Sequence, residues 1–355
     1  MSSARIHRAL ALASISTALV LALSAPQARA AETYRVRSLV SDGGVPAAHK
    51  DKNLVNGWGI AFGPGSAPAW VADNGTGKST IYNGNGKKLP LDVTIPQGAP
   101  TGIVFNGTSG FAVGKGKKRG PAAFIFDSEA GVISGWSPTA DMNNAITAFT
   151  AKDGAIYKGL ALVTSGQPRL YATDFHNGKV DVLDESFHLA KAPGGFTDPN
   201  LPNHFAPFGI REVDGKLIIT FAKQDADRHD DLHGPGLGFV DQFDTQGHLL
   251  MRLVSHGALN APWGIALAPA DFGPAGGNLL IGNFGDGRIH AYDPVTGAFR
   301  GTLKHESEPV KIDGLWGITF GNGVATQPAD TLFFAAGPGD ESHGQYGRID
   351  VVSHH

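Results

Sequence analysis

Five acidic and imidazole side chains follow strand-like segments of the sequence and could together bind a divalent cation. They are Asp174, His176, Asp225, Asp286 and His343. Carboxylate oxygens suit a hard cation such as Ca²⁺, whereas imidazole nitrogens suit a transition metal with an open position for water. A bound ion of either kind could polarise a carbonyl group or acidify water. The five residues lie far apart in the chain, so this chemistry depends on a fold that brings their segments together.

A second set of polar and aromatic residues could bind a small molecule or a glycan. It comprises Asn56, Trp58, Asp73, Asn177, Lys223, Trp263, Asn283 and Trp316. The tryptophan rings could line a rim for a sugar, although burial is the commoner use of such large apolar surfaces. Likewise, Asp and Asn in turns often cap their own backbone. No catalytic residue is predicted, because the sequence contains neither an HExxH nor a Gly-x-Ser-x-Gly motif.

A short sequence motif centred on a glycine recurs along the chain. The repeated units that contain it would position both sets of candidate residues. The clearest copy of the motif is residues 261–267 (APWGIAL), and close copies surround Gly59 and Gly317. Weaker copies surround three further glycines, which makes six copies spaced 43 to 57 residues apart. A repeat of this length with strand-like units is typical of a β-propeller. The sequence therefore predicts an all-β fold with six blades.

Each unit divides into four strand-sized pieces, which we call A to D from the inside of the ring outward. In the fifth unit these are residues 263–267, 278–283, 288–292 and 299–303, joined by turns rich in Gly, Asp and Pro. In a propeller the B–C loops and the loops that lead into strand A share one end of the ring. Both candidate sets would then surround the mouth of the central channel.

The second unit and the segment that follows it are less regular than the fifth unit. In the second unit, residues 111–113 are expected to form strand B, residues 122–126 strand C and residues 132–136 strand D. The basic residues between the first two pieces are interpreted as an exposed loop tip. Residues 141–149 are expected to form a short turn of helix.

The two ends of the chain predict how the ring closes. Residues 34–40 alternate in polarity but belong to no unit, and the sixth unit lacks a strand after residues 348–352. Pairing of these two segments would complete the last blade and remove the open edges of the array. We therefore expect one propeller domain over residues 31–355.

The first thirty residues have the pattern of a secretory signal peptide. A basic start is followed by the apolar residues 9–23, and Ala28-Arg29-Ala30 offers small residues at a cleavage site. The apolar run is shorter than the roughly twenty residues that a membrane-spanning helix needs. The sequence predicts cleavage after Ala30, export to the periplasm or the cell exterior, and no membrane span in the mature chain.

Composition narrows the possible partners. The net charge is −3, and removal of residues 1–30, which contain three arginines and no acid, makes it −6. An acidic chain without a basic stripe is not expected to bind nucleic acid. The absence of cysteine excludes disulfides and thiolate metal sites. The 49 glycines and 22 prolines fit many short strands joined by tight turns.

Several motifs give the chain a family resemblance. They are residues 56–59 (NGWG), 174–178 (DFHNG), 206–210 (APFGI), 222–225 (AKQD), 259–264 (LNAPWG), 282–287 (GNFGDG), 313–317 (DGLWG) and 340–344 (DESHG). The units resemble NHL-type blades. More specifically, the chain is similar to uncharacterised exported bacterial proteins associated with PEP-CTERM sorting. That resemblance implies a propeller outside the cytoplasm and names no activity.

Two functions remain open at this point. The first is a ligand-binding or scaffold propeller with its site at the channel mouth. The second is a cation-dependent hydrolase or lyase, similar to the gluconolactonase and strictosidine-synthase-like propellers. The polar insertion at residues 224–233 lacks the Gly and Glu that a calcium-binding EF-hand requires, and is interpreted as a solvated, lid-like loop.

Overall fold

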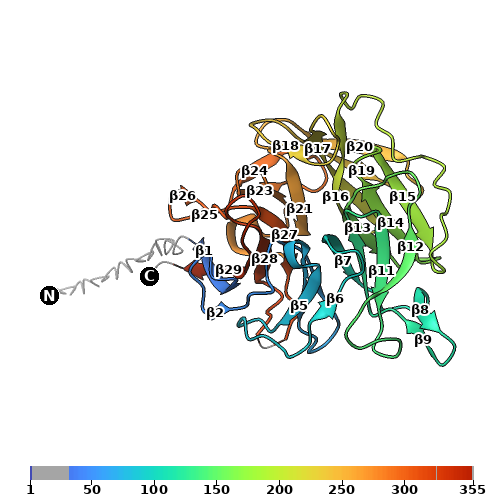
Figure 1. Ribbon diagram of the computed structural model, residues 1–355. Coiled ribbons are helices and arrows are strands. Elements are labelled where there is room, and N and C mark those ends of the chain that lie inside the picture. The colour runs from blue at the N-terminus through green and yellow to red at the C-terminus, as the bar shows by residue number, and fades with distance from the viewer. Residues whose placement is uncertain (2–31, 325, 354–355) are drawn as a thin grey trace.

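The protein is a ring of small antiparallel sheets, as a computed structural model shows (Figure 1). The structure describes residues 1, 32–324 and 326–353. Six sheets each place their first strand innermost, so the predicted six-bladed β-propeller is confirmed. Apart from Met1, the predicted signal peptide lies outside the described residues. Within the part of the chain that is described, no helix has both the length and the apolar character needed to cross a bilayer.

The first three blades follow one another along the chain. Blade 1 contains β3 (Gly57–Phe62), β4 (Ala69–Asp73), β5 (Lys78–Tyr82) and β6 (Val93–Thr94). Blade 2 contains β7 (Pro100–Phe105), β10 (Phe124–Ser128), β11 (Val132–Trp136) and β12 (Ile146–Thr150). Blade 3 contains β13 (Tyr157–Val163), β14 (Arg169–Asp174) and β15 (Lys179–Asp184), one strand fewer than predicted.

The other three blades complete the ring. Blade 4 contains β16 (Phe205–Val213), β17 (Lys216–Gln224), β19 (Phe239–Phe243) and β20 (Leu249–Ser255), with β18 (Asp231–Leu232) paired to β17. Blade 5 contains β21 (Pro262–Leu267), β22 (Leu279–Asn283), β23 (Ile289–Tyr292) and β24 (Phe299–Thr302). Blade 6 contains β27 (Leu315–Phe320), β28 (Leu332–Ala336), β29 (Gln345–Ser353), β1 (Glu32–Ser41) and the short β2 (His49–Lys50).

The recurring glycine lets neighbouring inner strands come into backbone contact. A Cβ atom added to Gly264 of blade 5 would lie 2.8 Å from the carbonyl oxygen of Trp316 in blade 6. Each blade has a glycine that approaches the backbone of the next blade in this way; at Gly102 the nearest atom is the Leu160 amide nitrogen (2.5 Å), and the circle closes where Gly317 faces the carbonyl oxygen of Trp58. The glycines in this cycle are Gly59, Gly102, Gly159, Gly209, Gly264 and Gly317. Only a residue without Cβ fits such a close approach, which explains the repeat seen in the sequence.

The chain closes by pairing its first and last strands, as predicted. Strand β1 runs antiparallel to β29, with Tyr34 opposite Val351, and Figure 1 shows them side by side at one edge of the molecule. The Tyr34 hydroxyl donates to the carbonyl oxygen of Phe272 (3.0 Å) and accepts from the amide of Ala275 (2.7 Å). The first strand is therefore fastened to blade 5 as well as to blade 6.

The second blade differs from its predicted division. Strand β10 pairs directly with the inner strand β7, so it is the second strand of the blade rather than the third. The segment expected as strand B belongs instead to a separate hairpin of β8 (Ala112–Lys115) and β9 (Lys118–Pro121), which carries the basic residues on its exposed turn. The expected helical turn is wrong as well, because β12 pairs with β11 there. Alternating burial of apolar side chains against the blade favours a strand over a helix at this position.

A left-handed backbone residue precedes five of the six inner strands. The residues are Asn56, Ala99, His204, Ala261 and Gly314, with φ between 44° and 67°. Only Gly314 adopts this conformation without steric cost, since residues with a Cβ rarely enter it. The kink turns the chain from the outer edge of one blade into the channel, which fixes the side chains at the start of each inner strand.

Candidate functional site

All inner strands begin at the same end of the ring. The loops between the second and third strands of each blade lie there too, because neighbouring strands within a blade are antiparallel. We call this the loop end. It is where the sequence places both sets of candidate residues, and it presents two layers: an aromatic layer inside the channel and a polar network above it.

The aromatic layer fills the channel just below the loop end. The rings of Trp58 and Trp316 stack with centroids 3.6 Å apart, and Phe284 stacks on the other face of Trp316 at 4.0 Å. Trp263 meets both indoles edge-on. Trp58 and Trp316 are only 2% and 1% exposed, so their rings are packing elements rather than a rim for a ligand.

A chain of side-chain hydrogen bonds connects the blades above this layer. Trp316 Nε1 donates to Asn56 Oδ1 (3.0 Å), while Asn56 Nδ2 donates to Glu341 Oε2 (2.5 Å) and to Asn74 Oδ1 (3.3 Å). Asn74 Nδ2 in turn donates to Glu129 Oε2 (2.8 Å). The network therefore runs from blade 6 through blade 1 to blade 2.

Lys158 continues the network into blades 3 and 4. Its ammonium group forms ion pairs with Glu129 and, at 3.1 Å, with Asp230, and it lies 5.2 Å from the centre of the Trp58 ring. The side chain is 2% exposed. Burial by itself would lower the pKa of Lys158, but the negative charges of Glu129 and Asp230 outweigh it and hold that pKa above its usual value. Lys158 is therefore a permanent cation at the centre of the loop end.

Asp231 is an unusually weak acid beside this cation. Burial raises its pKa to about 7, against the opposing charge of Lys158. Its Oδ2 atom has no hydrogen-bond partner among the described residues. Burial likewise raises the pKa of Glu341. A carboxyl group that changes protonation near neutral pH is a candidate proton donor or acceptor.

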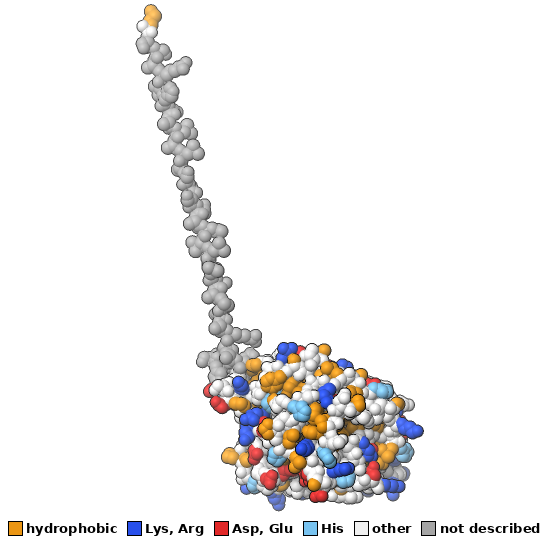
Figure 2. Space-filling view, turned by 90° about the horizontal axis from the view of Figure 1, so that it is seen from above, with side chains coloured by type: hydrophobic (Ala, Val, Ile, Leu, Met, Phe, Trp, Pro, Cys, Tyr) orange, Lys and Arg blue, Asp and Glu red, His pale blue; other side chains and the backbone are white. Residues whose placement is uncertain are grey.

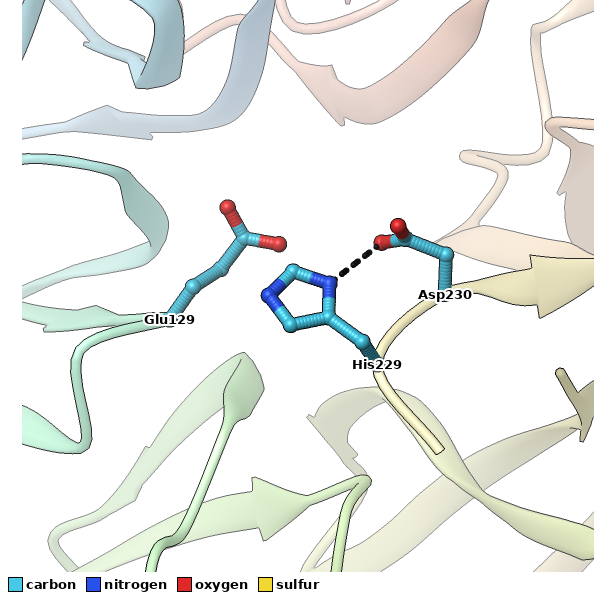
Figure 3. Close-up of side chains that lie close together, drawn as sticks. All are labelled: Glu129, His229 and Asp230. Carbon is cyan, nitrogen blue, oxygen red and sulfur yellow. Dashed lines mark hydrogen bonds and ion pairs between the residues drawn. The ribbon is translucent and has the colours of Figure 1, made fainter. Parts of the chain in front are cut away.

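Glu129, His229 and Asp230 form the candidate metal-binding group of the described residues. One ligand atom from each lies within 4.8 Å of the others. Figure 3 shows the Glu129 carboxylate and the His229 ring directed toward one another, and His229 Nδ1 lies 3.0 Å from Asp230 Oδ1. Because the Lys158 ammonium group already contacts both carboxylates, a metal ion would have to share them with a fixed positive charge.

The structure separates the predicted ligand-binding residues into two groups. Asn56 and the three tryptophans meet in the two layers at the loop end, where Trp263 Nε1 donates to the carbonyl oxygen of Lys158 (2.7 Å). The others lie outside these layers: Asp73 is fully buried within blade 1, Asn177 caps Asp174, Lys223 lies in β17, and Asn283 donates to Ala258 and Asp286.

The five predicted metal ligands are not gathered into one cluster. Within the described chain, no three of them have ligand atoms within 4.8 Å of one another. Each has another partner instead: Asp174 accepts from Asn177, His176 contacts the Arg228 carbonyl, Asp225 accepts from the His229 amide, Asp286 pairs with Arg288, and His343 pairs with Asp42. The three aspartates contact residues two to four positions away, as Asp in turns often does, whereas the two histidines contact distant parts of the chain.

The distribution of charge over the outer surface also bears on possible partners. On the face shown in Figure 2, acidic, basic and hydrophobic side chains are interspersed, and Lys and Arg do not gather into a stripe. That face therefore offers no extended basic surface of the kind that binds nucleic acid.

The fold and the loop end define a six-bladed β-propeller with a polar network over an aromatic layer. No protein-family model matches the chain. The uncharacterised protein R648 of Acanthamoeba polyphaga mimivirus is 34% identical over 309 residues, covering 82% of this chain and 74% of R648. The uncharacterised protein L690 of the same virus is 32% identical over 308 residues, covering 82% and 79%. The chain belongs to the family of these mimivirus proteins.

This membership corrects the resemblance to exported bacterial proteins associated with PEP-CTERM sorting. The relatives that the comparison supports are viral proteins. The motifs that suggested the bacterial proteins centre on glycines that contact the next blade, such as Gly59, Gly209 and Gly264. Ring geometry requires these glycines, so they identify the propeller fold rather than one family within it.

Solved structures support the fold alone. A virginiamycin B lyase from Staphylococcus aureus in complex with quinupristin aligns with a TM-score of 0.52 and 14% identity, over 90% of this chain and 100% of the lyase. A gluconolactonase from Xanthomonas campestris aligns with a TM-score of 0.52 and 13% identity, over 84% and 87%. At this level of identity the comparison shows the shared architecture, and function has to be argued from the site itself.

Proposed function

We propose that the protein binds a polyhydroxylated small molecule or glycan at the loop end. The observation that carries the proposal is the single network of Asn56, Asn74, Glu129, Lys158, Asp230 and Glu341, to which five blades contribute. Hydroxyl groups both donate and accept hydrogen bonds, so they match a surface that mixes carboxylates, amides and an ammonium group. The hydrogen bonds and ion pairs between these side chains hold them in place before a ligand arrives.

The accessible edge of the network is the loop that carries His229 and Asp230. Their side chains are 49% and 64% exposed, whereas Lys158 beneath them is buried. A ligand would therefore contact the loop first and reach the Lys158 pair by displacing the Asp230 carboxylate. This agrees with a lid-like role for the polar insertion in blade 4.

A glycan array followed by titration calorimetry tests the proposal. We expect Glu129→Gln and Asp230→Asn to weaken the best binder about tenfold, because each removes a charged hydrogen-bond acceptor. Arg300→Gln, which removes an exposed charge from blade 5, is the matched control. Absence of binding to every glycan and polyol, or equal affinity in all variants, would contradict the proposal.

A second candidate function is cation-dependent hydrolysis or elimination at the same end. The observations that favour it are the Glu129, His229 and Asp230 group and the neighbouring Asp231, whose pKa of about 7 suits proton transfer. A gluconolactonase and a lyase share the architecture. Elemental analysis of purified protein, with and without His229→Ala, separates the two functions: stoichiometric metal that is lost in the variant supports catalysis, and metal-free protein that melts identically with a chelator opposes it.

We also propose that the protein is exported and that residues 31–355 form one domain. The signal-like pattern before Ala31 supports export. Expression of the full chain in a bacterium, followed by N-terminal sequencing of the periplasmic and medium fractions, should show a mature protein that begins at Ala31. A single cooperative transition in calorimetry should accompany it. Retention of the uncut chain in the cytoplasm would count against export.

A further inference from the structure

The channel also contains a cavity on the other side of the aromatic layer. Its volume is about 380 Å³, and the inner strands of all six blades line it. Each blade contributes one apolar residue next to its channel glycine: Ile60, Ile103, Leu160, Ile210, Ile265 and Ile318. Trp263 forms the boundary with the aromatic layer. A concave space of this size, with apolar side chains and a few polar groups on its lining, is typical of small-molecule sites, and it is distinct from the loop end.

One cationic side chain extends across this apolar space. Arg211 belongs to β16 of blade 4, yet its Nη1 atom donates to the carbonyl oxygens of Ile265 in blade 5 (3.2 Å) and Ile318 in blade 6 (3.3 Å). Its Nη2 atom donates to Thr319 Oγ1 (3.2 Å). The guanidinium group is therefore held in a fixed position inside the channel by two other blades.

Arg211 has no carboxylate partner among the described residues. Every acceptor that the structure gives it is an uncharged oxygen. The neighbouring Glu212 accepts from the Gly215 amide at the β16–β17 turn (2.6 Å) and does not pair with Arg211. Burial lowers the pKa of Arg211, although the group stays charged at neutral pH. The Glu212 carboxylate, which also lines the cavity, offsets this burial only in part through its charge. A bound anion would compensate the buried cation further.

The remaining donors of Arg211 define what the anion would be. Its Nε–H group has no acceptor among the described residues, so part of the guanidinium remains free to donate. Guanidinium donors match a planar carboxylate better than a single-point acceptor. The isoleucine and leucine side chains of the lining accommodate a hydrocarbon body, whereas the negative charge of Glu212 on the same lining disfavours a multiply charged anion.

We propose that the channel cavity binds a small carboxylic acid, with its carboxylate on Arg211 and its apolar body against the isoleucines and Leu160. The site goes beyond the proposed function because it lies on the opposite side of the aromatic layer from the loop end. It requires no contribution from Glu129, Asp230 or the glycan-binding network, so the two proposals fail or succeed independently.

Ligand-observed NMR and calorimetry on the full mature chain test this site. The probes are hexanoate and benzoate, their neutral amides hexanamide and benzamide, and inorganic phosphate. We expect at least one carboxylate to bind, its amide to bind about tenfold more weakly or not at all, and phosphate not to compete. Equal binding of acid and amide, tighter binding of phosphate, or no binding of either carboxylate would overturn the proposal.

Substitutions then test whether the carboxylate probe binds inside the cavity. Arg211→Gln should reduce carboxylate affinity about tenfold or more, whereas Arg300→Gln on the outer surface should leave it unchanged. Ala161→Leu, which adds bulk to the cavity wall, should also reduce binding without changing any charge. Should Arg211→Gln fail to fold, the acid–amide comparison on the unmodified protein and the Ala161→Leu variant still decide the matter. Full affinity in a folded Arg211→Gln or Ala161→Leu variant would refute the assignment.

Discussion

Trp58 and Trp316 stack with their ring centroids 3.6 Å apart, although 258 positions separate them in the chain. The stack joins the first blade to the sixth, and Trp316 also donates to Asn56. Trp316→Ala should lower the free energy of unfolding by about 3–5 kcal/mol, because it leaves a large cavity in the channel. Trp316→Phe should cost less, since it keeps most of the ring surface. Urea denaturation measures both, and an unchanged Trp316→Ala midpoint would show that the layer does not hold the blades together.

Lys158→Met should destabilise the protein on the order of 3 kcal/mol, because the half-buried Glu129 loses its cationic partner. The double variant Lys158→Met with Glu129→Gln should recover part of that loss, since the unpaired charge is then absent. The exposed pair of Arg300 and Asp293 provides the comparison: Arg300→Met should change stability by less than about 1 kcal/mol. Equal losses for both lysine and arginine variants would contradict the central role of Lys158.

Gly264→Ala should destabilise the ring, because it adds a methyl group where two inner strands touch. The new Cβ would lie 2.8 Å from the Trp316 carbonyl oxygen, so two inner strands would have to separate. We expect a drop in melting temperature of several degrees. Gly107→Ala, at an exposed position whose nearest neighbour is the Phe105 ring at 3.3 Å, is the control and should melt close to the unmodified protein.

Asp127 should make the protein less stable as the pH rises from about 4 to about 7. Burial raises its pKa to about 7, so the folded protein holds the proton more tightly than the unfolded chain, whose pKa is near 3.8. Stability contributed by the neutral acid is therefore lost across that window. Asp127→Asn keeps the acceptor for Thr101 and Gly102 and should flatten the stability profile by up to about 1.4 kcal/mol per pH unit.

Denaturant titrations at pH 4, 5.5 and 7 measure this slope. Asp293→Asn is the control, because hydrogen bonds from Arg300 and the backbone lower the pKa of Asp293, and its titration falls below the window. An Asp127→Asn profile parallel to that of the unmodified protein would mean that Asp127 is ionised inside the fold.

The ring was predictable from the sequence because its geometry requires the same residue type at regular intervals along the chain. Each inner strand needs a glycine where the next blade touches it, as Gly59 and Gly264 show. Closure was predictable too, since the alternating segment at residues 34–40 belongs to no repeat unit and the sixth unit lacks a strand. These features depend on backbone contacts that recur six times, and recurrence is what sequence analysis detects.

The candidate site was only partly predictable. Glu129 was missed because the second blade was divided one strand too early. The signal was present: an Asp stands at or next to the last residue of three second strands, namely Asp73 in β4, Asp127 in β10 and Asp174 in β14, and the loop after it lies at the loop end. His229 and Asp230 have no counterpart in other blades, so only the tertiary contact of Asp230 with Lys158 places them.

The pairing of β1 with β29 also sets an order of events during synthesis. Blades 1 to 5 consist of contiguous segments, so each can form while later residues are still being added by the ribosome. The sixth blade must wait for its last strand, and until then the seam between Gly317 and Trp58 stays open. A prematurely terminated chain would thus contain five complete sheets around an open channel. Its unpaired strand edge is a feature that cellular quality control could recognise.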